Sequence, residues 1–471
     1  MRSLKMRLLF FLLMPVTGFA QTQPPVSKEL KPDEFFAIVK KYHPVIKQAD
    51  IQVKLSENNI MAARGAFDPS LYLDKDQKTF DGKNYFGHQD AGIKIPTWYG
   101  VELKAGFENN GGALLQSEKT PGESSYMGIS IPLARNLLID KRRAMLQQSK
   151  IFLQQSTAER ENMINNILYE AGQAYWNWVN NYQSNEIMKE IVAINRQRFE
   201  LVKIGFRQGD RPAIDTIEAL AQCQYFEGKQ TETEVQLQQA MIELSGYLWL
   251  EENVFYNLSE NTIPGKTATE AVIAREEMPN LDDLISQSKI NHPLLRSYNF
   301  KQSALLVDKK LKFQSLLPIV NFQANLLDKG YTFFKNVESG YVRNNNKFGI
   351  DIGIPLRLRE GRSAYRSARL KIEETGLQIS LKKREIENKI RYYFVELAGL
   401  QKQFEIAEAA YRNYEALRRA ENTRFQAGES SLFLVNNREN KAVEARIKLA
   451  DVRAKFYQKK IALSWAAGTL L

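Results

Sequence analysis

The sequence predicts a mostly α-helical, elongated protein in which long antiparallel coiled-coil helices are joined to two β sections that supply barrel strands. Three observations predict this fold class. The chain repeats one pattern twice, each copy contains a very long helical segment, and each contains segments in which apolar and polar residues alternate. Its 471 residues are 44% hydrophobic and 25% charged, which is the composition of a folded protein.

The N-terminus has the three-part layout of a secretory signal peptide. Arg2, Lys5 and Arg7 accompany an apolar run that ends at Val16, and small residues follow it. The run is too short to be a membrane-spanning helix. We therefore expect residues 1–20 to be removed, which lowers the formal charge from +11 to about +8 because three basic residues leave. Export and this mild excess argue against a nucleic-acid partner.

The rest of the chain contains the same unit twice, in the same order. The matching segments are His43-Pro44 with His292-Pro293, Pro69 with Pro318, Gly128–Leu133 with Asp351–Leu356, and Phe206–Asp210 with Phe425–Glu429. We predict a first repeat at 28–257, with a β section at 68–132 and a long helical hairpin at 134–250, a linker at 258–279, and a second repeat at 280–471, with a β section at 318–356 and a hairpin at 359–467. Each repeat opens with a helical segment, at 33–64 and at 281–313.

The β sections alternate with a period of two. Val320, Phe322, Ala324 and Leu326 are separated by polar residues, and so are the apolar residues from Val101 to Phe107. One apolar and one polar face is the pattern of a transmembrane β-strand, and also of a soluble sheet packed on helices. Aromatic residues gather near the expected strand ends and loops, as they do at membrane interfaces: Tyr72, Phe80, Tyr85, Phe86, Trp98, Tyr99, Tyr126, Tyr331, Phe333, Phe334 and Tyr341. With the predicted signal peptide, this favours membrane strands.

The helical runs are unusually long. No proline occurs at 359–426, and a helix of that length measures roughly 100 Å at ~1.5 Å per residue. A coiled-coil seam with spacings of four and three runs along it: Ile386, Ile390, Tyr393, Leu397, Leu400, Phe404, Ala407, Tyr411 and Tyr414. In the first repeat Ile187, Ile191, Ile194 and Leu201 keep this spacing, and Arg198 interrupts it. We expect its asparagine-rich face (Asn177, Asn180, Asn181 and Asn185) to be exposed to water.

In these features the chain resembles the TolC-like outer-membrane efflux protein family, as two tandem family repeats. The parts that carry the resemblance are the residue-Pro pairs, the strand exits at Ile131 and Ile354, Gly361-Arg362 and the two FxxG turns. The resemblance implies a homotrimer whose strands form one barrel in the lipid of the outer membrane and whose helices form a periplasmic tube. It also implies a periplasmic adaptor and an inner-membrane transporter as partners, in a tripartite efflux or type I secretion system.

One departure concerns the first β section, which is longer than the second. It has room for four strands, with IPTWYG (95–100) as an additional turn, where the usual family unit has two. Either the barrel has more than the family's usual twelve strands, or the additional hairpin folds outside the barrel.

The sequence offers little for catalysis, and we expect no catalytic residue, metal or cofactor. His43 and His292 precede prolines at equivalent positions, where helix capping is the better interpretation. His88 lies in an expected loop, and Cys223 is the single cysteine. No Cys–His cluster or phosphate-binding glycine loop occurs.

The turns between the long helices are the candidate functional sites, because in the family they form the periplasmic tip. Gly209 and Gly428 should end one helix with a positive φ, and Asp210, Ser430 and Ser431 could cap the next. Past the first glycine come Arg211, Asp215 and Glu218; Leu434 and Asn437 match these two acids in the second repeat. Three protomers would repeat Asp215 and Glu218 as an acidic ring that favours cations or holds basic partners across the closed tip. Carboxylates that merely suit a helix start are the alternative.

Three other classes of protein fit this sequence less well. A periplasmic adaptor has one helical hairpin between two halves of a β domain, whereas whole units repeat here. A coiled-coil scaffold leaves the alternating strands and the signal peptide unexplained, and a periplasmic hydrolase lacks a site. The exported substrate does not follow from the sequence.

Overall fold

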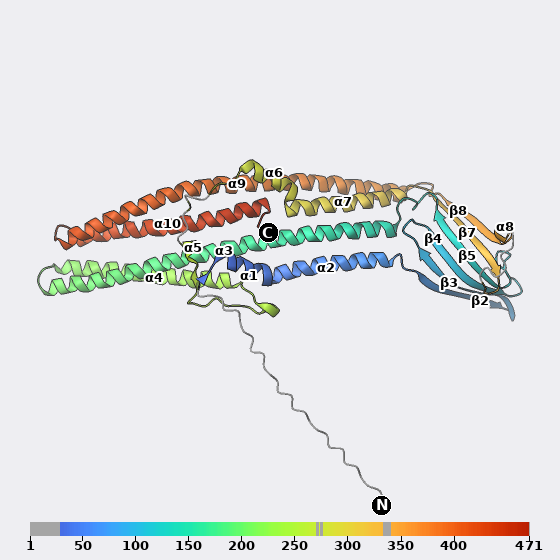
Figure 1. The fold of residues 1–471 in the computed structure, drawn as a ribbon, viewed down its shortest axis with the longest axis horizontal. Helices are drawn as coiled ribbons and strands as arrows, with labels where there is room; N and C mark the ends of the chain where they lie inside the picture. Colours follow the sequence, from blue (N-terminus) through green and yellow to red (C-terminus); the bar gives the residue numbers. More distant parts are fainter. Residues whose placement is uncertain (1–28, 270–272, 274–276, 333–340, 471) are drawn as a thin grey trace, which may run out of the picture.

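A computed structural model describes residues 29–269, 273, 277–332 and 341–470. The predicted signal peptide, together with Phe333 and Phe334, lies outside the described residues. The molecule is a long rod in which the helix axes run along its length, with one six-stranded β-sheet at its end (Figure 1). Within the described chain, every helix falls short of the length and apolarity that crossing a membrane requires.

Both halves of the chain share one general plan, in which two short helices are followed by a β section and a long helical hairpin. The helices are α1 (Pro32–Tyr42), α2 (Pro44–Gly65), α3 (Lys141–Arg207), α4 (Ala213–Ser245), α5 (Lys266–Thr269), α6 (Leu281–Asn291), α7 (Pro293–Gln314), α8 (Tyr341–Asn344), α9 (Arg359–Gln426) and α10 (Leu432–Ala467), with a 3-10 turn at Glu251–Asn253. The strands are β1 (Glu29–Leu30), β2 (Ser70–Phe80), β3 (Lys83–Pro96), β4 (Glu102–Gly111), β5 (Gly122–Pro132), β6 (Ile263–Pro264), β7 (Ile319–Lys329) and β8 (Asn346–Gly353).

The helix expected at the start of each repeat is two helices, because proline interrupts it. Pro44 and Pro293 lack the N–H of an α-helical interior, so each stands at the first position of a new helix, α2 or α7. The preceding histidines cap these helices, as predicted: Nδ1 of His43 accepts from Val45 N at 3.3 Å, and Nδ1 of His292 accepts from Leu294 N at 3.2 Å.

Two long hairpins, α3–α4 and α9–α10, make up the half of the rod away from the sheet, while α2 and α7 lie beside α3 and α9 nearer the sheet (Figure 1). Most of the apolar positions predicted along α9 are buried, among them Ile386, Ile390, Leu397, Leu400 and Phe404. Towards the tip it opens: the Tyr414 side chain is 37% exposed.

Two expectations for α3 are wrong. Leu201 is exposed, because the seam near it is occupied by the polar contacts of Arg198. Asn185 is buried instead of facing water, because α4 packs over this face and Thr233 Oγ1 donates to its Oδ1 at 3.4 Å; Asn177, Asn180 and Asn181 are half-buried.

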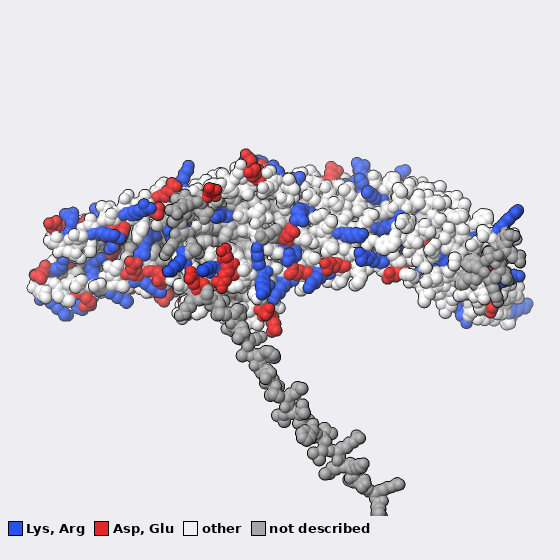
Figure 2. Space-filling model, viewed as in Figure 1, with Lys and Arg blue, Asp and Glu red and all other residues white. Residues whose placement is uncertain are grey.

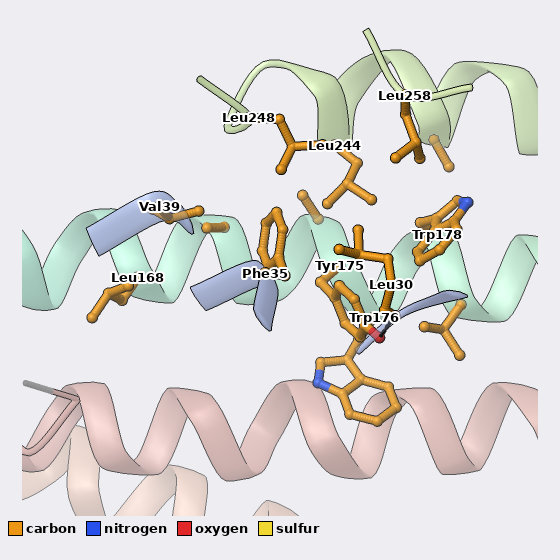
Figure 3. Packing of buried hydrophobic residues seen from close by; sticks show 14 of the residues in the cluster. Leu30, Phe35, Val39, Leu168, Tyr175, Trp176, Trp178, Leu244, Leu248 and Leu258 are labelled. Carbon is orange, nitrogen blue, oxygen red and sulfur yellow. Dashed lines mark hydrogen bonds between the residues drawn. The ribbon is translucent and has the colours of Figure 1, made fainter. Parts of the chain in front are cut away.

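The largest core of the rod lies where the start of the described chain crosses the middle of α3. Figure 3 shows Leu30 and Phe35 packed against Tyr175, with Trp178 near Leu258. The Tyr175 hydroxyl donates to the carbonyl of Leu30 at 2.9 Å, and burial raises the pKa of this hydroxyl. Trp176 points from the opposite side of α3 towards the second repeat (Figure 3). It stacks on Tyr457 of α10, with ring centroids 4.4 Å apart, which joins the first repeat to the second.

All four strands of the first β section belong to one sheet with the two strands of the second. The order is β2-β3-β4-β5-β7-β8, and every neighbouring pair is antiparallel. The additional hairpin is therefore part of the sheet, and the expectation of four strands at 68–132 is confirmed. The turn between β3 and β4 is anchored by Trp98, whose ring stacks on that of Phe67 with the ring centroids 4.2 Å apart.

The sheet has one apolar and one polar face. Directly paired residues on the apolar face include Ile95 with Leu103, Leu103 with Ile129, Ile131 with Phe322, and Phe322 with Ile350. The polar face carries pairs such as Lys94 with Lys104, Asp90 with Glu108, Ser130 with Gln323, and Asn321 with Asp351. These strands alternate as the sequence predicts, with a period of two.

Tyrosines and glycines fit together on the polar face. A Cβ on Gly92 would lie 2.7 Å from the Tyr72 hydroxyl, and one on Gly106 would lie 2.8 Å from that of Tyr126. The two hydroxyls contact each other, and that of Tyr126 donates to Asp90 Oδ1 at 3.0 Å. Glycine is needed at both positions because each ring lies against the neighbouring backbone.

A close backbone approach marks the return from sheet to shaft. A Cβ on Gly361, in the first turn of α9, would lie 2.7 Å from the carbonyl oxygen of Ser315 at the end of α7. The Gly361-Arg362 pair that contributed to the resemblance thus has a physical cause, since only glycine lets the two helix ends meet at this distance.

Candidate functional site at the hairpin tips

The two tip turns have the same backbone geometry. Gly209 has φ +86° and Gly428 has φ +78°, which confirms the predicted left-handed helix ends. In both turns the next residue closes a six-residue hydrogen-bonded loop: Asp210 N donates to Gly205 O and Glu429 N to Arg424 O, each at 2.9 Å. This is the Schellman arrangement, in which glycine avoids the strain that a Cβ would bring.

The predicted caps are only partly right. Ser431 caps α10, accepting from Leu434 N at 3.4 Å. Ser430 does not cap, because its hydroxyl donates to Glu421 Oε1 at 2.6 Å. Asp210 does not cap either, because α4 starts three residues later at Ala213, with Pro212 in the cap position and no side-chain cap bond.

Arg211 joins the first tip to the second hairpin. Its Nη1 lies 3.4 Å from Asp215 Oδ2, and its guanidinium lies 4.1 Å from the centre of the Phe425 ring on α9. Arginine over an aromatic face is attracted by the ring quadrupole. The Asp215 side chain is 19% exposed, so this carboxylate is largely enclosed between the two hairpins.

Glu218 is also held against the second hairpin. Asn436 Nδ2 on α10 donates to Glu218 Oε1 at 3.1 Å. Asp215 and Glu218 therefore share a face of α4, as their spacing predicts, and each has a partner in this chain that orients it.

A buried ion pair that the sequence did not suggest lies near these acids. Glu439 on α10 accepts from Arg198 at 3.0 and 2.5 Å and from Asn195 at 2.7 Å. Arg198 Nη1 also lies 3.4 Å from Asn436 Oδ1, so the network continues to Glu218. The available signal was the position of Arg198 in a coiled-coil seam, where a lone charge requires an opposite charge facing it.

The second tip has its own ion-pair cluster. The nearly buried Glu421 accepts from Ser430 and lies 3.7 Å from Arg438 Nε and 3.9 Å from Arg424 Nη1. Six residues earlier on α9, hydrogen bonds from Arg418 and Arg419 lower the pKa of Glu415 to about 2. Glu415 is therefore held ionised by arginines of its own helix, and the contact of Glu421 with Arg438 ties the last turns of α9 to α10.

Apolar packing joins the four tip helices as well. Val202 on α3, Ala219 on α4, Phe425 on α9, and Leu432 and Val435 on α10 form one buried cluster. A hollow of about 400 Å³ lies beside it, with Arg198, Arg211 and Arg418 among its lining residues. The two tips are therefore one structural unit within this chain.

The matching positions of the second repeat, Leu434 and Asn437, point away from this junction. Both are exposed, as is Arg207 at the end of α3. Several large apolar side chains at the tip are also exposed: Phe206, Ile214, Ile217, Phe433 and Leu434. Figure 2 shows charges of both signs gathered around this end of the rod and spread along the shaft.

The comparisons with known proteins agree with this architecture. Residues 284–469 match the family model described as "Outer membrane efflux protein". No curated protein sequence matches the chain. The structure is similar to the CmeC outer membrane channel of Campylobacter jejuni, with a TM-score of 0.62, 14% identity, and coverage of 93% of this chain and 85% of that one.

Two further solved structures are similar over the same share of this chain. The outer membrane protein VceC of Vibrio cholerae gives a TM-score of 0.61 at 15% identity, covering 93% of this chain and 96% of that one. The MtrE outer membrane channel of Neisseria gonorrhoeae gives 0.65 at 12% identity, covering 93% and 88%. At these identities the likeness establishes the fold.

Proposed function

We propose that this chain, a member of the outer membrane efflux protein family by the match over residues 284–469 and by the fold of its described length, is an outer-membrane channel. It assembles as a homotrimer and conducts solutes passively from the periplasm to the outside. A periplasmic adaptor and an inner-membrane transporter load it, in a tripartite efflux or type I secretion system.

The sheet is the observation that carries this proposal. Its apolar face is open to the surroundings in the single chain: Ile350 is 57% exposed and Ile352 69%. A hollow of about 650 Å³ on this face is lined mainly by apolar side chains, such as those of Ile93, Met127 and Phe322. Soluble proteins rarely leave so large a continuous apolar surface uncovered, and lipid chains are the partner that fits it.

The shaft supports the periplasmic part of the proposal. α9 has 68 residues and α3 has 67, which corresponds to roughly 100 Å at ~1.5 Å per residue. Helices of that length bury their faces only against neighbours of the same kind. Three copies of the two hairpins provide such neighbours and enclose a tube.

The tip supports the part of the proposal in which an adaptor docks on the channel and opens it. Its exposed apolar side chains, such as Ile217 and Phe433, offer a surface for an adaptor. The Arg211 and Glu218 contacts hold the first hairpin against the second, so a partner that separates them opens the tube end. A periplasmic adaptor, the alternative considered from sequence, is disfavoured because two complete hairpins share one sheet.

The test combines localisation, channel activity and a pair of neighbouring substitutions. Ala324 and Gln323 are adjacent near the middle of β7, the strand next to the edge strand β8, and lie on the apolar and the polar face of the sheet, respectively. Lysine on a lipid-facing strand costs about 2–4 kcal/mol at the bilayer midplane. Ala324→Lys should therefore reduce the amount of protein in the outer membrane, and Gln323→Lys should leave it unchanged.

The wild-type protein should fractionate with the outer membrane as a heat-dissociable oligomer and give ion-conducting channels in planar bilayers. Recovery of the full chain in the soluble periplasmic fraction, or equal effects of the two lysines, would refute the proposal.

A further inference from the structure

We infer that the two edge strands of the sheet, β2 and β8, pair with each other between neighbouring copies in the trimer, which closes a barrel of eighteen strands instead of twelve. The inference rests on the proposed function, from which it takes the membrane location and the number of copies. What it adds is the seam, its register and the strand count.

The first step is that both edges of the sheet are open. In the described part of the chain, β2 pairs only with β3, and β8 only with β7. Both edges carry apolar residues with high exposure: Leu71 at 84% and Leu73 at 71% on β2, and Phe348 at 75% on β8. A long apolar edge with unpaired N–H and C=O groups cannot stay uncovered in a bilayer, where no water satisfies them.

The second step is that the two edges match in direction. β2 follows α2 and runs away from the helices, whereas β8 runs back towards α9 (Figure 1). When β8 of one copy lies beside β2 of the next, the two strands are antiparallel, like every other neighbouring pair in the sheet. The alternation of directions is then unbroken around the barrel.

The third step is the register. From Ser70, the first residue of β2, the paired positions across the sheet are Lys94, Lys104, Gly128, Asn325 and finally Lys347 on β8. The end of β8 nearest the helices is Gly353, six positions beyond Lys347. Placing the next copy's Ser70 opposite Gly353 keeps the helix-proximal strand ends level, and the register then advances by six residues over six strands.

An advance of one residue per strand fixes the tilt. With ~3.3 Å per residue and ~4.8 Å between strands, the strands lean about 35° from the barrel axis. Barrel strands tilt by about 35–45°. A register shift of one residue would turn the apolar side chains into the lumen, so the only alternative registers differ from this one by an even number of residues. A shift that places Ser70 opposite Asp351 gives about 25°, below that range, and the opposite shift places Ser70 opposite Pro355, beyond β8.

The fourth step is that this register pairs complementary side chains. On the apolar face it sets Leu71 opposite Ile352 and Leu73 opposite Ile350, which continues the hydrophobic band across the seam. On the polar face it sets Asp76 opposite Lys347, a pair of opposite charges. Directly opposed residues of these kinds stabilise antiparallel pairs.

Barrel diameter grows roughly linearly with strand number, so eighteen strands enclose a lumen about one and a half times as wide as twelve. The outer-membrane part of the channel is then wide, and the helical tip is left as the constriction that selects solutes.

Disulfide trapping on isolated outer membranes tests the seam. In a Cys223→Ser background, Asp76→Cys with Lys347→Cys places two thiols opposite each other within one aqueous lumen. After oxidation, non-reducing gels should show covalent dimers and trimers that collapse to monomers on reduction. The control pair Lys75→Cys with Lys347→Cys puts the thiols on opposite faces and should give monomers only. A second pair, Asp74→Cys with Gly349→Cys, repeats the test at another point of the seam.

The outcomes separate the seam from the proposed function. If the variants form heat-dissociable trimers with channel activity but neither pair links chains, the seam is wrong and the channel remains. A disulfide within one chain, or a covalent ring that closes at a number of chains other than three, also overturns the eighteen-strand barrel. Absence of the wild-type protein from the outer membrane refutes the proposed function itself.

Discussion

Arg198 on α3 and Glu439 on α10 form a doubly hydrogen-bonded ion pair inside the junction of the two hairpins, with Nη1 3.0 Å from Oε1 and Nη2 2.5 Å from Oε2. The Glu439 side chain is 0% exposed and that of Arg198 only 12%. Each charge therefore depends on the other, since water does not reach the carboxylate.

Breaking this pair on one side should destabilise the protein strongly. Arg198→Met leaves a buried carboxylate without its cation, and the expected loss in free energy of unfolding is about 3–5 kcal/mol. The double variant Arg198→Met with Glu439→Leu should recover part of that loss. Thermal unfolding in detergent measures the loss of stability. The control is Arg196→Met, which removes an exposed partner of Glu227. Equal melting temperatures for Arg198→Met and Arg196→Met would contradict the assignment.

The α9 seam should respond to loss of packing. Phe404 is 1% exposed and lies with Leu400 in a buried apolar cluster between α9 and α10. Phe404→Ala should therefore cost about 3–5 kcal/mol and Leu400→Ala about 2–5 kcal/mol in free energy of unfolding. The measurement is the temperature at which the helical signal is lost in circular dichroism. Ile406→Ala on the exposed side of the same helix is the matched control, because Ile406 is 70% exposed.

Arg211 should act as a latch between the hairpins. Arg211→Gln removes both the contact with Asp215 and the stacking on Phe425, so the tip should open more readily. We expect a larger single-channel conductance and greater sensitivity of cells to large antibiotics. Arg207→Gln, at an exposed neighbouring position, should behave like wild type. Wild-type conductance of Arg211→Gln would show that the tip is held elsewhere.

The acids of the tip should set ion selectivity. If three copies bring Asp215 and Glu218 around one axis, Asp215→Asn with Glu218→Gln should reduce the preference for cations in planar bilayers. The effect should shrink at high salt, because charges in contact with water are screened over about 10 Å at 0.1 M. A reversal potential equal to that of wild type under a salt gradient would leave both carboxylates with a packing role only.

His292 should make stability depend on pH. Burial, with Lys389 nearby, lowers the pKa of His292 to about 4 from the ordinary 6.5. The neutral ring is favoured in the folded state, so its contribution is complete above pH 6.5 and is lost as the pH falls towards 4, on the order of 3 kcal/mol in all. His292→Asn keeps a capping side chain and should flatten the profile of melting temperature between these values. An unchanged slope would assign the dependence to other groups, among them His43, whose pKa burial also lowers.

The sequence by itself determined the periodic parts of this protein. Alternation with period two predicted the sheet and its two faces, heptad spacing predicted the seam through Ile390 and Leu397, and the glycines at 209 and 428 predicted the helix ends. These features are local, because each follows from the conformational or burial preference of residues a few positions apart.

Only the tertiary structure decided how distant residues meet. The sequence left open whether the additional hairpin joins the sheet, and hydrogen bonding of β3 to β4 and of β5 to β7 settles it. From the sequence, Arg198 interrupts an apolar seam, but in the structure α10 places Glu439 opposite it. The sequence also predicts that Asn185 is exposed, but in the structure α4 covers it. Such contacts join residues that are 48 and 241 positions apart, and no short-range pattern specifies how the helices that carry them pack side by side.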